Sequence, residues 1–176
     1  MKKVLIPIVW GATIVITLLS ISCKKSSPTN AKSEKYKIVT GTWKQTDIVL
    51  GVPVSVKVGG NRYDFPAGTS MITNPYLNAF GVTAFFQPTT GNSYQFSDSG
   101  TYHFLGTTDL ILPVAGNSGK WTLEVYDAVL KLTSTSSDSD PHWINAITSD
   151  SLSLSMTVSI PGLGDAPLNL LLQKQP

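Results

Sequence analysis

"SYQFSDSGTYHF", residues 93–104, contains two short runs in which large aromatic residues alternate with polar ones. The aromatic residues occupy every second position on each side of residues 97–100: Tyr94, Phe96, Tyr102 and Phe104. A β-strand sends successive side chains to opposite faces, so each run would carry its rings on one face. Gly100 can adopt the positive φ of a tight turn without steric cost. The stretch therefore predicts a β-hairpin with one apolar face.

The same period of two recurs along most of the chain. Alternating sets are Val52, Val54, Val56 and Val58; Trp121, Leu123 and Val125; Leu152, Leu154, Met156 and Val158; and Leu168, Leu170 and Leu172. Hydrophobic residues make up 41% of the sequence, which is enough for a sizeable core, and charged residues only 14%. We expect an all-β domain of about eight to ten short strands, as a sandwich or an antiparallel up-and-down barrel.

Two segments lack this regular alternation. Residues 59–92 are rich in Gly, Pro and Asn, and within them "NPYLNAF" predicts one helical turn with Asn74 as its cap and Pro75 first inside. Residues 106–119 contain a short apolar run at 110–112. Each segment could be a lid over a barrel end, an extra strand or an ordinary long loop.

A Gly, one other residue and a Trp occur together twice, in "GTWKQ" (41–45) and "GKWTL" (119–123). Trp43 and Trp121 each begin a predicted strand, with the indole on the face that carries the other apolar residues. Gly41 and Gly119 would let the chain approach its neighbours closely. We interpret these four residues as structural, closing the end of a barrel or lying in its core, and not as a binding site.

The N-terminal residues 1–22 have the features of a bacterial export signal. Lys2 and Lys3 precede an apolar run at residues 4–19, and "SIS" then leads to Cys23, the only cysteine of the chain. The segment resembles a lipoprotein signal peptide, which is cut before the cysteine, whose sulfur then carries diacylglycerol. An uncleaved membrane anchor and an ordinary secretory signal are the alternatives.

After the signal, residues 23–37 read as the lipidated Cys and a flexible basic tether, and residues 38–176 as the folded domain. Without Lys2 and Lys3 the chain holds 11 basic and 11 acidic residues. The tether has five Lys and one Glu, whereas the domain has six basic against ten acidic residues. The domain therefore has no basic patch of the kind that nucleic-acid binding requires. No pattern predicts an oligomeric state.

The order of these elements resembles the lipocalin-like domains of small bacterial lipoproteins, over about residues 38–174. The resemblance implies a barrel of eight strands in which the first-strand Trp packs across the closed end, and whose apolar interior can hold a small ligand. Lipocalins also place a late Arg against that Trp, but the only Arg here is Arg62, and no C-terminal helix follows. An eight-stranded barrel can also be filled by its own side chains.

Residues suited to catalysis or metal binding are not grouped in the sequence. His103 and His142 lie in different segments and read as surface residues, and Asp138 and Asp140 near His142 read as a solvated turn. No serine lies in a nucleophile-elbow pattern, and no glycine-rich loop opens a helix. We therefore expect no enzymatic activity, no metal and no cofactor.

Two functions remain open. The chain is either a membrane-anchored lipoprotein whose barrel binds a small apolar ligand, or a structural or protein-interaction lipoprotein with a filled core. A cavity within the barrel would favour the first. The resemblance to lipoproteins places the protein in the bacterial cell envelope, with the periplasmic face of the outer membrane favoured.

Overall fold

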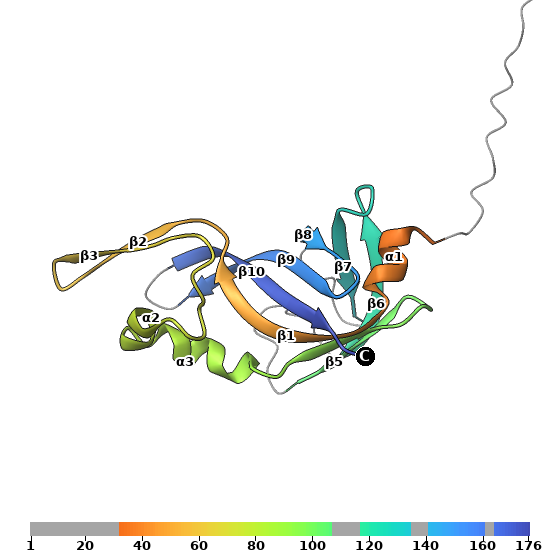
Figure 1. Cartoon of the computed structure of the whole chain (residues 1–176), viewed down its shortest axis with the longest axis horizontal. Helices are drawn as coiled ribbons and strands as arrows, with labels where there is room; N and C mark the ends of the chain where they lie inside the picture. Colours follow the sequence, from red (N-terminus) through yellow and green to blue (C-terminus); the bar gives the residue numbers. More distant parts are fainter. Residues whose placement is uncertain (1–31, 107–116, 135–140, 161–163) are drawn as a thin grey trace, which may run out of the picture. The chain divides into compact units, whose positions relative to one another are not determined.

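A closed barrel of eight antiparallel strands is the main feature of the computed structural model (Figure 1), which describes residues 32–106, 117–134, 141–160 and 164–176. Around the barrel the strands follow the order β1, β10, β9, β8, β7, β6, β5 and β4, and β4 pairs again with β1. Their bounds are β1 Gly41–Leu50, β4 Ser93–Phe96, β5 Thr101–Leu105, β6 Ser118–Glu124, β7 Val129–Thr133, β8 His142–Ile147, β9 Ser151–Ile160 and β10 Gly164–Lys174.

The barrel confirms the all-β, up-and-down fold expected from the sequence, and excludes the sandwich. The hairpin predicted at 93–104 is formed by β4 and β5, and Gly100 in its turn has a φ of 81°. β1, β9 and β10 are ten or eleven residues long, which is longer than the short strands that we expected.

The core lies inside the barrel and follows the predicted alternation. Every second residue of β9 and β10 is buried: Leu152, Leu154, Met156, Val158, Ile160, Ala166, Leu168, Leu170 and Leu172. Opposite residues of the two strands, such as Leu154 and Leu170, lie on the same inner face. Burying each large apolar side chain contributes about 1.5–3 kcal/mol, so the inner face supplies much of the stability of the fold.

The two ends of the barrel differ in their connections. At one end, residues 97–100, 125–128 and 148–150 join consecutive strands by short turns, and the helix α1 (Glu34–Val39) precedes β1 there. The long insertion at residues 51–92 leaves β1 at the opposite end, because each strand is antiparallel to its neighbours. We call these the α1 end and the insertion end.

Helix α1 begins inside the segment that we predicted to be a flexible tether. Ser33 caps it by accepting a hydrogen bond from the backbone N–H of Tyr36 at 3.0 Å, and Val39 at its end is fully buried. Lys32 already belongs to the same compact unit as the barrel. Residues 32–37, which we assigned to the tether, therefore pack with the barrel as part of one compact unit.

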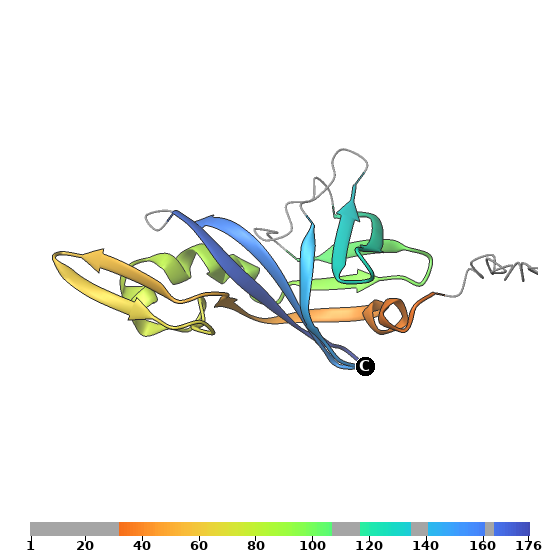
Figure 2. The same cartoon turned by 90° about the horizontal axis from the view of Figure 1, so that it is seen from above.

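The insertion forms its own small structure outside the barrel (Figures 1 and 2). It contains the strands β2 (Val54–Val58) and β3 (Asn61–Phe65), the helices α2 (Pro75–Ala79) and α3 (Val82–Phe86), and the 3₁₀ turn η1 (Gln87–Thr89). The predicted strand at 52–58 exists, but it pairs only with β3 in a separate two-stranded sheet. Residues 59–92 are thus neither a plain loop nor a barrel strand.

The helical turn predicted at residues 74–80 is confirmed as α2. The side chain of Asn74 accepts hydrogen bonds from Tyr76 N–H at 3.0 Å and Leu77 N–H at 3.1 Å, which satisfies two of the free amides at the helix start. Of the second irregular segment, residues 107–116 lie outside the described residues, while Ser118 and Gly119 belong to β6.

Candidate binding site

Trp43 lies fully buried at the α1 end of the barrel. Its indole Nε1 donates a hydrogen bond to the Val39 carbonyl oxygen at 2.7 Å, which ties the end of α1 to β1. Lys174, near the end of β10, places its Nζ 5.2 Å from the centre of the Trp43 ring and donates to the Ile38 carbonyl oxygen at 2.7 Å. The ammonium group is therefore held by a cation–π contact and by a hydrogen bond.

Gly41 makes this arrangement possible. A Cβ at this position would lie 2.6 Å from Lys174 Cε, and the φ of Gly41 is 133°, which other residues rarely adopt. The late cation that we missed in the sequence is therefore Lys174. The resemblance to lipocalins implied an Arg in this place, whereas Arg62 lies in β3, outside the barrel.

Trp121 lies in β6 below helix α1, at the same end of the barrel. It is 1% exposed, and its Nε1 donates to the Ser97 carbonyl oxygen at 3.0 Å. The Tyr36 ring stacks on it with a centroid distance of 4.2 Å, and the Phe96 ring meets it edge-on at 5.6 Å. The two tryptophans thus close one end of the core together, each with its polar N–H satisfied.

Gly119 allows β6 and β7 to approach closely. A Cβ at this position would collide with the Thr133 carbonyl oxygen and lie 2.9 Å from Cε1 of Tyr102. Because one of the obstacles is backbone, the neighbours could not move away cheaply.

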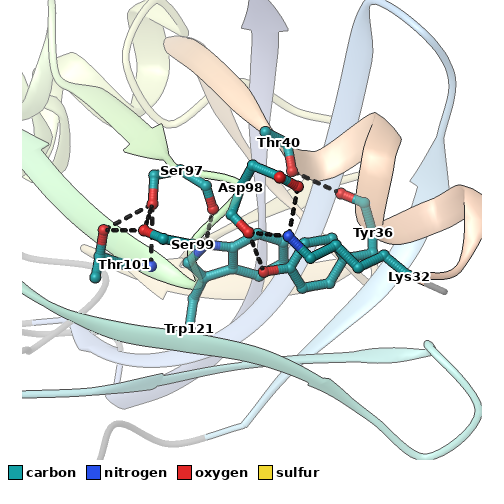
Figure 3. A network of polar contacts seen from close by, with 8 residues as sticks. All are labelled: Lys32, Tyr36, Thr40, Ser97, Asp98, Ser99, Thr101 and Trp121. Atoms are coloured by element: carbon teal, nitrogen blue, oxygen red, sulfur yellow. Dashed lines mark hydrogen bonds and ion pairs between the residues drawn. The ribbon is translucent and has the colours of Figure 1, made fainter. Parts of the chain in front are cut away.

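Polar contacts between α1 and the β4–β5 turn complete this end (Figure 3). Lys32 forms an ion pair with Asp98 at 2.6 Å, and the hydroxyl of Tyr36 donates to the Asp98 carbonyl oxygen at 3.3 Å. Thr40 donates to the Tyr36 carbonyl oxygen at 3.0 Å at the end of the helix. Helix α1 is therefore fastened to the barrel by stacking and by polar contacts.

Gln45, two residues after Trp43, brings a polar group into the interior. It is 5% exposed and lies opposite Leu172 in β10, which also faces inward. Its Nε2 donates to Oγ1 of Thr89 at 2.8 Å, and that hydroxyl in turn donates to the Phe86 carbonyl oxygen at 2.7 Å. Gln45 Oε1 is buried and has no hydrogen-bond partner among the described residues, which costs about 1–3 kcal/mol.

Our prediction that His142 is a surface residue was wrong. It is 1% exposed at the start of β8, where it lies opposite the fully buried Leu130 of β7. Pro141 beside it suggested a loop, but the strand begins at His142 itself. His103 is exposed on β5, as predicted. Together with the buried side chains of Gln45 and Tyr94, His142 gives the barrel interior a partly polar lining.

Within the described ranges, no three His, Cys, Asp or Glu side chains gather where they could hold a metal ion. Cys23, Asp138 and Asp140 lie outside these ranges. None of the helices described is both long and apolar enough to cross a membrane.

A cleft of about 420 Å³ lies beside the β2–β3 hairpin, and nothing in the sequence pointed to it. It is lined by residues 62–66 and by Thr69, Asn74 and Tyr76, and we call it the hairpin cleft. Arg62 Nε pairs with the carboxylate of Asp64 at 2.8 Å, and Ser55 also donates to that carboxylate. The hydrogen bond from Ser55, followed by that from Arg62, lowers the pKa of Asp64 below its usual value.

Neither a protein-family model nor a curated protein matches this chain. We therefore infer the function from the geometry of the barrel and from the residues themselves.

Proposed function

We propose that the chain is a lipid-anchored, non-enzymatic envelope protein with a lipocalin-like barrel, which binds a small, largely apolar ligand through the insertion end. One observation carries the proposal: the barrel is closed at its α1 end by Trp43, Trp121 and α1, whereas its opposite end carries the insertion. Ligand sites in β-barrels lie in the mouths of the barrels, so a ligand would enter at the insertion end.

The interior also suits an apolar ligand that carries one polar group. Its walls are Leu, Ile, Val, Met and aromatic side chains, so the body of the ligand would gain from burial. Gln45 Oε1 is an acceptor without a partner at this depth. A ligand with a hydroxyl or amide N–H could satisfy it, and would gain the energy that the unpaired oxygen now costs.

The anchor rests on the sequence around Cys23. Eight residues separate it from Lys32, so the folded domain could lie at most roughly 30 Å from a lipid on Cys23. Two or more acyl chains hold a protein stably at a membrane. We propose the periplasmic face of the outer membrane. The mass of the N-terminal peptide tests the anchor: an unmodified Cys23, or unchanged membrane partitioning of Cys23→Ala, would exclude it.

Ligand binding is tested separately, on the mature chain. Native mass spectrometry of protein extracted from membranes should show a co-purified small molecule, and N-phenyl-1-naphthylamine, an apolar dye with one N–H, should bind with a Kd of roughly micromolar. Gln45→Leu should weaken dye binding about five- to tenfold, the equivalent of one hydrogen bond. The matched control is Lys44→Leu, whose side chain is exposed on the outer face of the same strand.

A structural or protein-interaction role is the second candidate. It is favoured by the burial of the largest inward side chains, including Trp43, Trp121 and Tyr94, each of which is at most 1% exposed. A barrel filled by its own residues would bind no dye and carry no co-purified molecule. That pair of results would replace the ligand-binding proposal with this one.

A further inference from the structure

The outer edge of β3 is an open strand edge. β3 pairs with β2 on one side only, and no other strand of the described residues pairs with it. The turn between the two strands is Gly59-Gly60, both with positive φ, so its flanking residues Val58 and Asn61 form a hydrogen-bonded pair. Hydrogen-bonded and non-hydrogen-bonded pairs alternate along the hairpin.

This alternation fixes which backbone groups face outward. The pairs Val58–Asn61 and Val56–Tyr63 exchange their hydrogen bonds within the hairpin. The N–H and C=O groups of Arg62 and Asp64 therefore point away from β2. Within the described residues, no backbone hydrogen bond joins them to another segment. Such an edge is a template for a further strand.

The hairpin cleft runs along the same edge. Residues 62–66 are consecutive, and side chains of consecutive strand residues alternate between the two faces. A cleft that touches all of them follows the edge of the strand and not one of its faces. The cleft therefore leaves open space beside residues 62–66, with Tyr76 of α2 next to it.

The sequence of β3, "NRYDF", is complementary in charge to its own reverse. We propose that a second copy of this chain pairs with this edge, as an antiparallel β3–β3 contact with its twofold axis at Tyr63. Arg62 then lies opposite Asp64 of the second copy, and Asp64 lies opposite Arg62 of the second copy. Both positions have outward backbone groups, so each opposite pair exchanges two backbone hydrogen bonds.

Charge selects this register among those that the hydrogen bonds allow. The two neighbouring registers that the hydrogen bonds allow have their twofold axis at residue 62 or at residue 64. They would place Arg62 opposite a second Arg62, or Asp64 opposite a second Asp64, and like charges directly opposite repel. The outer edge of β2 has no such match, because Lys57 would lie opposite Ser55. The edge of β3 is thus the self-complementary one.

The charged side chains are accessible for such a contact. Those of Arg62 and Asp64 are 63% and 65% exposed. Their contact within one chain uses Arg62 Nε and one carboxylate oxygen, and a second nitrogen donates to Ser55 at 3.0 Å. The third guanidinium nitrogen and the other carboxylate oxygen are left for a partner. A five-residue contact is small, so the dimer should be weak, with a Kd of roughly micromolar or higher.

Sedimentation equilibrium of residues 23–176 with Cys23→Ser tests the proposal, since this variant can form neither a lipid anchor nor a disulfide. The parent should show a monomer–dimer equilibrium. Arg62→Asp and Asp64→Arg should each raise the dimer Kd about tenfold or more, because each turns both attractive pairs into repulsive ones. The double variant R62D/D64R should return to the Kd of the parent.

Mixing the two single variants gives the decisive measurement. R62D carries two acidic residues and D64R two basic ones, so together they should form a heterodimer at least as tight as the parent dimer. This result also requires both variants to be folded. Lys120→Asp, a reversal of an exposed charge on β6, should leave the Kd unchanged. A monomeric parent, or a mixture no tighter than either variant alone, would overturn the proposal.

Discussion

The Nζ of Lys174 lies 5.2 Å from the centre of the Trp43 ring, so the last strand of the barrel contacts the first through a cation above an indole. The same ammonium group donates to the Ile38 carbonyl oxygen, next to the residue that receives the Trp43 N–H. The side chains of Trp43 and Lys174 therefore join the end of α1 to the first and last strands of the barrel.

Removing this cation should lower the stability of the barrel. Lys174→Met keeps much of the alkyl stem but loses the cation–π contact and the hydrogen bond, so we expect the free energy of unfolding to fall by about 1–3 kcal/mol. Lys174→Arg should retain most of the stability, because guanidinium groups also stack on indoles. Urea unfolding followed by tryptophan fluorescence measures both; equal stabilities of the Met and Arg variants would contradict this role.

The buried tryptophans should matter for stability before they matter for binding. Trp43→Ala and Trp121→Ala each remove a fully buried indole, and should lower the free energy of unfolding by about 3–5 kcal/mol. Trp143, which is 53% exposed, provides the control, because its replacement by Ala should cost less than about 1 kcal/mol. A folded Trp43→Ala variant with unchanged stability and lost dye binding would show that the indole is part of a site instead.

Gly119 should tolerate no side chain. In Gly119→Ala the new methyl group meets the Thr133 carbonyl oxygen, so β6 and β7 must separate locally. We expect a loss of about 1–3 kcal/mol in the free energy of unfolding, and faster hydrogen exchange in β7. Ser118→Ala, one residue earlier and exposed, should be close to neutral. Similar melting temperatures for the two variants would rule out this close approach.

Asp64 should titrate at a pH lower than usual for an aspartate, because Ser55 and Arg62 hydrogen-bond its carboxylate. Its folded-state pKa lies below the unfolded one, so its stabilising contribution is present above the unfolded pKa and is lost as the pH falls through the folded one. In Ser55→Ala the pKa of Asp64 should rise, as an NMR titration of its side-chain carboxyl carbon would measure. An unchanged titration would mean that Ser55 does not hold the carboxylate in solution.

The barrel could be predicted from the sequence because its strands are half-buried and therefore alternate visibly, as in Leu152 to Val158. At residues 52–58 the same signal correctly predicted a strand, but alternation shows only that one face is covered and not which surface covers it. Val54 and Val56 belong to a separate two-stranded sheet and are packed against the core, whereas Val58 is 40% exposed.

The α1 end was less predictable because it depends on contacts between distant residues. Six residues are too few to form a stable helix alone, so α1 depends on contacts such as the stacking of Tyr36 on Trp121. Lys174 stands 131 positions after Trp43, and only the closing of the barrel brings the two together. The buried His142 was missed for a similar reason, because only the pairing of β8 with β7 places it opposite the buried Leu130.

Helix α1 also determines how a mechanical load would enter the domain. A pull on the chain before Lys32 reaches the Lys32–Asp98 ion pair and the Tyr36–Trp121 stack before it reaches β1. These contacts connect the load to β6 and to the β4–β5 turn, so it is shared among several strands. β1 itself, paired with β4 on one side and β10 on the other, would be shielded from peeling away at its first residue. Helix α1 would thus protect the start of β1 from a pull on the chain that precedes it.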